Sequence, residues 1–149
     1  MAIAPQVYGF FNNIVTLNGV VITGYADGDD VVKLTPNAPI SEAVVGALGE
    51  VVFNDNADKS YKCELTLQQT APINTYLRGL AAQQRIPGAR AVALTLSITD
   101  LARRDRFTGT SGRIVEVPEF VRGQKAGKYT WKLHFGIGIA QEAAVAPMV

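Results

Sequence analysis

The sequence predicts a mainly β protein: a barrel or sandwich of about seven antiparallel strands with one packed helix. Apolar and polar residues alternate along several segments of the 149-residue chain, which is the period of a half-buried strand. Only residues 72–83 show apolar residues at helical spacing. Strands and helices do not alternate, so the composition of elements does not favour the parallel sheet of an α/β protein.

The strongest local signal is a hairpin near the start of the chain. The apolar runs 14–17 and 20–23 flank Asn18-Gly19, and this pair suits a tight turn in which both central residues have positive φ. The clearest strand is 61–68, where apolar and polar residues alternate without interruption. One face of that strand is apolar, and its other face consists of Lys62, Glu64, Thr66 and Gln68.

The helix is predicted at 72–83, because Pro72 suits a first turn and a Pro-Gly pair follows the segment. Thr35–Gly49 is predicted to be a long loop, with the next strand beginning near Gly49. Asp100–Gly112 is predicted to be a charged connection. Further strands are predicted at 31–34, 92–99, 113–117 and 129–139.

The composition predicts one globular domain spanning residues 1–149, with apolar arms at both ends. Fourteen basic and thirteen acidic side chains leave a formal net charge of +1, without the basic excess of a general DNA-binding protein. No run approaches the ~18 apolar residues that span a membrane, and Met1–Gln6 lacks the pattern of a signal peptide. We therefore expect assembly in a cytoplasm and no membrane partner.

No residue pattern predicts catalysis, a cofactor or a metal. Cys63 and His134 are the only cysteine and histidine in the sequence, so an intramolecular disulfide and the usual zinc ligand sets are excluded. Cys63 lies on the apolar face of its strand and is predicted to be core, while His134 is predicted to be a surface or interface residue. The Asp27–Asp30 turn lacks the glutamate of a calcium loop, and Gly136–Gly138 lacks the third glycine of a dinucleotide-binding turn.

Three features favour a structural role through assembly. Several strands carry Thr, Ser and Gln on the face away from the core, and sheet edges of that kind invite pairing with another chain. Both termini are apolar without a periodic pattern. The predicted Thr35–Gly49 loop is longer than most connections, and such loops are usually functional or disordered.

One set of segments has a familiar order along the chain: Val7–Phe10, Gly24 with Gly28-Asp29-Asp30, Val45–Val51, Leu65–Leu77, Pro118 and Lys128–Trp131. This order of motifs resembles the tail tube protein family of contractile-tailed bacteriophages, which is related in fold to the tube proteins of pyocins and type VI secretion systems. Leu48 departs from the aspartate that the family usually has in its glycine-rich turn.

This resemblance implies a small β-barrel protomer with one helix. Six protomers would form a ring, and rings would stack into a tube that conducts genomic DNA inside a contractile sheath. The expected partners are further copies of the chain, the sheath, the baseplate and the tail terminator, and the expected location is the virion. Two alternatives remain: a terminator or baseplate ring protein of the same fold, or a cellular β-barrel module that binds a small molecule or carbohydrate.

Two sets of residues are candidate assembly sites. The lumen wall is predicted to be the polar face of strand 61–68 with Glu50 and Asn54 on its expected hairpin partner, because those side chains are hydrophilic without being a basic stripe. Ring-to-ring contacts are predicted for the Thr35–Gly49 loop, which would expose an apolar patch on a free protomer. The loop candidates are Pro39, Ile40, Ala43, Val44 and Val45.

Overall fold

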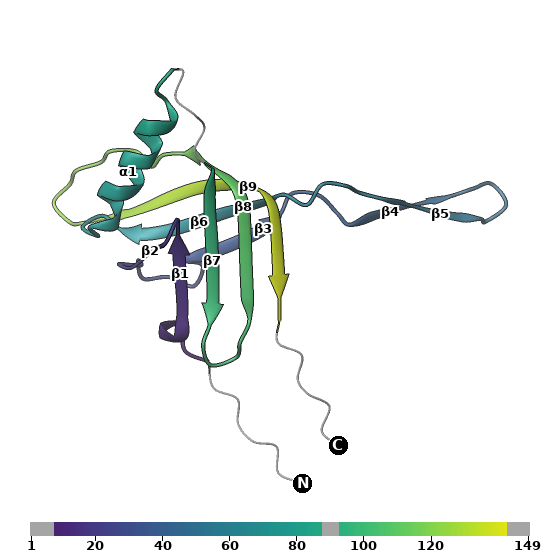
Figure 1. The fold of residues 1–149 in the computed structure, drawn as a ribbon, viewed down its shortest axis with the longest axis horizontal. Coiled ribbons are helices and arrows are strands. Elements are labelled where there is room, and N and C mark those ends of the chain that lie inside the picture. Colours follow the sequence, from purple (N-terminus) through teal and green to yellow (C-terminus); the bar gives the residue numbers. More distant parts are fainter. Residues whose placement is uncertain (1–7, 88–92, 143–149) are drawn as a thin grey trace, which may run out of the picture.

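A computed structural model describes residues 8–87 and 93–142. It consists of a seven-stranded antiparallel sheet, a separate two-stranded hairpin, one α-helix and a short 3-10 helix (Figure 1). The sheet has the order β2-β1-β7-β8-β9-β6-β3. The elements are η1 (Phe10–Asn12), β1 (Asn13–Leu17), β2 (Val20–Val21), β3 (Val32–Pro36), β4 (Ser41–Val45), β5 (Val51–Asp55), β6 (Tyr61–Gln68), α1 (Ile73–Gln84), β7 (Leu94–Asp100), β8 (Arg106–Glu116) and β9 (Lys128–Gln141).

The predicted fold class is confirmed, and so are its strongest local signals. Asn18 and Gly19 form the turn between β1 and β2, with φ of 51° and 81°. Strand β6 has the predicted bounds, and α1 lies one residue C-terminal to the predicted range. The apolar arms, in contrast, fall in residues 1–7 and 143–149, which lie outside the described residues.

The sheet bends sharply along β9, its longest strand. The first half of β9 pairs with β6, and its second half continues beside β8 (Figure 1). The Phe135 ring lies at this bend and is fully buried. A Cβ atom at Gly109 would lie 2.9 Å from that ring, and one at Gly112 would lie 2.4 Å from it. The glycines of β8 therefore make room for Phe135 inside the bend.

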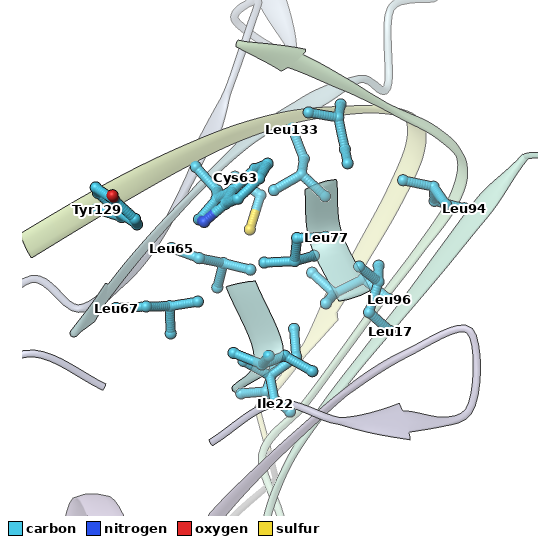
Figure 2. Close-up of a cluster of buried hydrophobic side chains, with 14 of the residues drawn as sticks. Leu17, Ile22, Cys63, Leu65, Leu67, Leu77, Leu94, Leu96, Tyr129 and Leu133 are labelled. Carbon is cyan, nitrogen blue, oxygen red and sulfur yellow. The ribbon is translucent and has the colours of Figure 1, made fainter. Parts of the chain in front are cut away.

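The core fills the space between the bent sheet and α1 (Figure 2). Leu77 anchors the helix in this core, and Trp131 Nε1 donates a hydrogen bond to Asn74 Oδ1 at 3.0 Å. Burial raises the pKa of the Cys63 thiol to about 12, so this thiol stays protonated at neutral pH and is a poor nucleophile. The completely buried side chains include Leu17, Cys63, Leu65, Leu67, Leu77, Leu96, Trp131 and Phe135.

Two arginines pack around the connection between β8 and β9. The Arg78 guanidinium on α1 lies 5.9 Å from the centre of the Phe120 ring in this connection, 5.2 Å from that of Tyr129 and 5.5 Å from that of Trp131. Arg122 lies 4.4 Å above the Phe120 ring and donates to the Tyr129 hydroxyl at 3.2 Å. Cation–π contacts of this kind stabilise by about 0.5–2 kcal/mol, depending on desolvation.

Two sequence-based segments are wrong. Thr35–Gly49 is not a loop, because β3 continues to Pro36 and β4 occupies Ser41–Val45. Its two glycines belong to the turn between β4 and β5, where Gly49 has a φ of 89°, and β5 begins at Val51. Asp100–Gly112 is not a connection throughout, because β8 begins at Arg106. Its glycines lie within the strand, where the Phe135 ring requires them.

Candidate assembly surfaces

The described part of the chain contains no cluster of side chains that could bind a metal ion. In residues 8–87 and 93–142, no group of three or more His, Cys, Asp or Glu side chains could hold a metal ion. Within the same ranges, no helix is both long and apolar enough to cross a membrane. The surfaces that remain are the outward face of the bent sheet and the β4–β5 hairpin.

The outward face of β6 is polar, as its alternation predicts. Cys63, Leu65 and Leu67 point into the core and are fully buried, whereas Lys62 and Gln68 on the other face are exposed. Each outward residue of β6 lies opposite an outward residue of β9. These cross-strand pairs are Lys62 with His134, Glu64 with Lys132, Thr66 with Thr130, and Gln68 with Lys128.

Opposite charges alternate across four strands in one row of this face. Lys33 on β3 lies opposite Glu64, and Glu64 lies opposite Lys132 on β9. Lys132 Nζ in turn lies 3.3 Å from a carboxylate oxygen of Glu116 on β8. Opposite-charge pairs across strands each stabilise a sheet by roughly 0.2–1 kcal/mol, so this row favours the observed register.

The same face nevertheless has a basic surplus. The row beside the alternating one contains Lys62, His134 and Arg113 on neighbouring strands, with no carboxylate between them. The net charge of the whole sequence gives no sign of this surplus, because the acidic residues that balance it lie outside this face. The charged residues of the face are Lys33, Lys62, Arg113, Lys128 and Lys132, against Glu64 and Glu116.

Glu50 and Asn54 do not belong to this face. Strand β5 pairs with β4, and β6 pairs with β3 and β9, so the expected β5–β6 hairpin is wrong. The sequence signal was ambiguous because β5 is followed by a turn-rich segment and then by β6. The structure places Glu50 in the turn of the β4–β5 hairpin, and it places Asn54 opposite Glu42.

The β4–β5 hairpin projects from the sheet as a separate two-stranded ribbon (Figure 1). Every residue from Glu42 to Asp55 is exposed. Among the predicted ring-to-ring residues, Ala43, Val44 and Val45 lie in β4, while Pro39 and Ile40 precede it. Large exposed apolar side chains of the hairpin and its flanks are Ile40, Val44, Val45, Leu48, Val51, Val52 and Phe53.

A hydrogen-bonded network holds the root of the hairpin. Asn37 follows β3, and its Nδ2 donates to Ser60 Oγ at 2.8 Å. The Ser60 hydroxyl donates to Asp58 Oδ1 at 2.6 Å, and its backbone N–H donates to the same oxygen at 2.9 Å. The Asn37 backbone N–H also donates to the Ser60 carbonyl at 3.1 Å. The two ends of the hairpin are therefore joined to each other by backbone and side-chain bonds.

His134 on β9 borders this root, with its Nδ1 3.4 Å from Asn37 Nδ2. The side chain is half-buried. The two bonds from Ser60 lower the pKa of the Asp58 carboxyl, and His134 adds a smaller effect in the same direction. Sequence reasoning missed Asn37, Asp58 and Ser60 as a group, because turn-forming residues 20 positions apart give no local sign that they meet.

Comparisons with known proteins agree with this architecture. The sequence matches the profile of the bacteriophage PhiTE tail tube protein family over residues 8–141. A search of curated protein sequences finds no match.

Among solved structures, the tube-terminating cap of the anti-feeding prophage is similar with a TM-score of 0.61 at 12% identity, covering 96% of this chain and 97% of that one. The sheath/tube terminator of an extracellular contractile injection system (PVC) has a TM-score of 0.61 at 13% identity, covering 93% and 99% of the two chains.

A chain from the sheath–tube complex of the same PVC system has a TM-score of 0.59 at 13% identity, with 91% of each chain covered. Identities this low show a shared fold alone. The family profile, however, spans nearly all of the described residues, and it confirms the resemblance found in the sequence. The chain belongs to the bacteriophage PhiTE tail tube protein family, whose members are structural tail components.

Proposed function

We propose that this protein assembles into hexameric rings that stack into the inner tube of a phage tail, through which DNA leaves the virion. The observation that carries the proposal is the β4–β5 hairpin, which lies outside the seven-stranded sheet and exposes its apolar side chains. Exposed apolar patches of this kind mark interaction sites. A ring is a closed heterologous assembly, in which such a protrusion meets a different surface on its neighbour.

The hairpin is the proposed ring-to-ring contact. Its apolar residues Ala43, Val44 and Val45, with Pro39 and Ile40 at its base, are the residues that stacking would cover. This assignment replaces the predicted loop with a two-stranded ribbon, but it keeps the same side chains.

The polar outward face of β6 is the proposed lumen wall, formed by Lys62, Glu64, Thr66 and Gln68. The alternating row through Glu64 and Lys132 supports this role, because neighbouring opposite charges weaken attraction for a polyanion, although the row beside it is basic. Glu50 and Asn54 are no longer proposed for the same wall, since they lie on the hairpin.

The proposed lumen is testable with Lys62→Cys in assembled protein. Because Cys63 is buried, the new thiol would be the reactive one. We expect a small maleimide to label it in the tube, whereas a maleimide carrying a long polyethylene glycol chain labels it only in dilute, unassembled protein. Equal labelling by both reagents in the tube would place this residue outside the lumen.

The proposed partners are the tail sheath, the baseplate and the terminator, and the proposed location is the virion after assembly in the host cytoplasm. A terminator role is a second candidate, favoured by the similarity to the tube-terminating cap and to the sheath/tube terminator. The third option, a cellular ligand-binding module, gains no support from the family match.

Negative-stain electron microscopy of the purified protein separates these functions. We expect long filaments of uniform width with a stain-filled channel. Single rings that do not stack would instead favour the terminator. A protein that stays monomeric at high concentration would contradict both assembly functions.

A further inference from the structure

Both faces of the β4–β5 hairpin carry exposed apolar side chains, and Glu42 and Asn54 share the face of Val44 and Val52. In an antiparallel pair, directly opposite residues point to the same side. Val45 lies opposite Val51, and Ala43 lies opposite Phe53, so these four side chains share one face. Val44 lies opposite Val52 on the other face.

Neither face is covered within the protomer. Val44 and Val52 are 54% and 58% exposed, and on the opposite side Val45 and Phe53 are 64% and 68% exposed. A sheet with one solvated face normally keeps that face polar. A ribbon of two strands is also marginally stable alone in water. Both faces therefore need a partner, and contact with one flat surface would cover only one of them.

The charge of the hairpin identifies the kind of partner. Residues 37–58 contain Glu42, Glu50, Asp55 and Asp58 and no basic side chain. All 14 basic side chains and the other nine acidic ones lie elsewhere in the sequence. The hairpin region thus has a formal charge of −4 and the rest of the chain +5. A second copy of this chain offers the opposite charge that the hairpin lacks.

We infer that the hairpin is inserted between two other copies of this chain, with one apolar face packed against each. This inference rests on the proposed self-assembly and adds to it the number of neighbours that one hairpin contacts. Electrostatic complementarity guides such an association and fixes its orientation, while the valines and Phe53 provide the buried apolar area.

Adjacent residues on opposite faces provide a matched pair for the test. Val44→Cys and Val45→Cys place one thiol on each face, and the native Cys63 stays silent because it is buried. Maleimide labelling is followed in dilute protomers, in assembled tubes and in protein unfolded by denaturant. We expect both thiols to react at full rate in the protomer and at least tenfold more slowly in the tube.

The number of neighbours is then counted by photo-crosslinking. A benzophenone amino acid is placed at Val44, at Val45 or at both, and the altered chain is assembled with an excess of unaltered protein. We expect covalent dimers from each single variant and covalent trimers from the double variant.

Tubes in which only one face is protected, or in which the double variant gives dimers alone, would overturn the two-neighbour inference and leave the proposed tube intact. Tubes whose hairpin thiols both remain reactive would overturn it as well. If the unaltered protein forms neither tubes nor rings, the proposed function itself fails, and the inference fails with it.

Discussion

The bent sheet and the β4–β5 hairpin are built from similar residues but are stabilised differently. In the sheet, the apolar side chains of β6 and of the first half of β9 are buried in the core beneath α1. In the hairpin, apolar valine side chains are exposed on both faces. The apolar surface of the sheet stabilises the protomer, whereas that of the hairpin can contribute free energy only on association. The comparison separates residues needed for folding from residues needed for assembly.

The largest difference should appear when one apolar side chain is shortened in each region. Leu65→Ala leaves a cavity in the core and should lower the free energy of unfolding by about 3 kcal/mol. Val52→Ala on the hairpin should change it by less than about 0.5 kcal/mol, as surface substitutions usually do. Urea unfolding of both variants as dilute protomers measures the two values. A cost at Val52 comparable to that at Leu65 would show that the hairpin is packed within the protomer.

A smaller effect should come from the bend in the sheet. Gly112→Ala would place a Cβ atom 2.4 Å from the Phe135 ring and 3.0 Å from the Leu94 carbonyl oxygen, and overpacking of this kind costs about 1–3 kcal/mol. Gly79→Ala is the matched control, because nothing lies within 4 Å of its added Cβ atom. Within the helix, that substitution should stabilise by roughly 0.5–1 kcal/mol. In thermal unfolding, the melting temperature should fall for Gly112→Ala and rise for Gly79→Ala.

The root of the hairpin should have a pH-dependent effect. The pKa of Asp58 is held below its ordinary value of 3.8 by bonds from Ser60. Its stabilising contribution is therefore present above pH 3.8 and is lost as the pH falls through the lowered value. Ser60→Ala removes the hydroxyl bond and should lower the free energy of unfolding at pH 7. The free energies of unfolding of wild type and Ser60→Ala should become more similar as the pH falls into the acid range. A gap between the two free energies that stays constant from pH 7 to pH 2 would contradict this assignment.

The smallest effect on protomer stability should follow from removing the hairpin. Residues 41–55 can be replaced by a short Gly-Ser turn, because the Asn56 N–H already bonds the Ile40 carbonyl at 2.8 Å. The melting temperature of the protomer should stay within about 2 °C, since no core side chain is lost, while tubes should disappear. Normal tubes from the shortened chain would remove the hairpin from the assembly mechanism.

Sequence reasoning predicted the fold well where pattern and burial coincide. The alternation in β6 and β9 predicted both strands because each has one face in the core and one in solvent. It failed for Gly109 and Gly112, which resemble loop residues until the Phe135 ring is known to lie beside them. It failed again for β4, since a ribbon exposed on both faces has no alternation to detect.

The candidate surfaces were predictable only in part. The polar face of β6 follows from local sequence, but its basic neighbours Arg113 and Lys132 join it through strand pairing between distant segments. The network at the root joins Asn37 to Ser60, which are in contact in space but are separated in the sequence by the entire hairpin. Contacts of that kind depend on register, which the sequence of either strand alone does not specify.

The central claim is that the sheet is stable in the protomer whereas the hairpin becomes stable on assembly, and hydrogen exchange tests it most directly. Amide exchange is measured in dilute protomers and in tubes, comparing β6 and β9 with β4 and β5. We expect the β6 and β9 amides to be protected in both states, and the β4 and β5 amides to exchange rapidly in the protomer and become protected in the tube. Hairpin amides that are already as protected as those of β9 in the protomer, or that remain unprotected in tubes, would contradict the account.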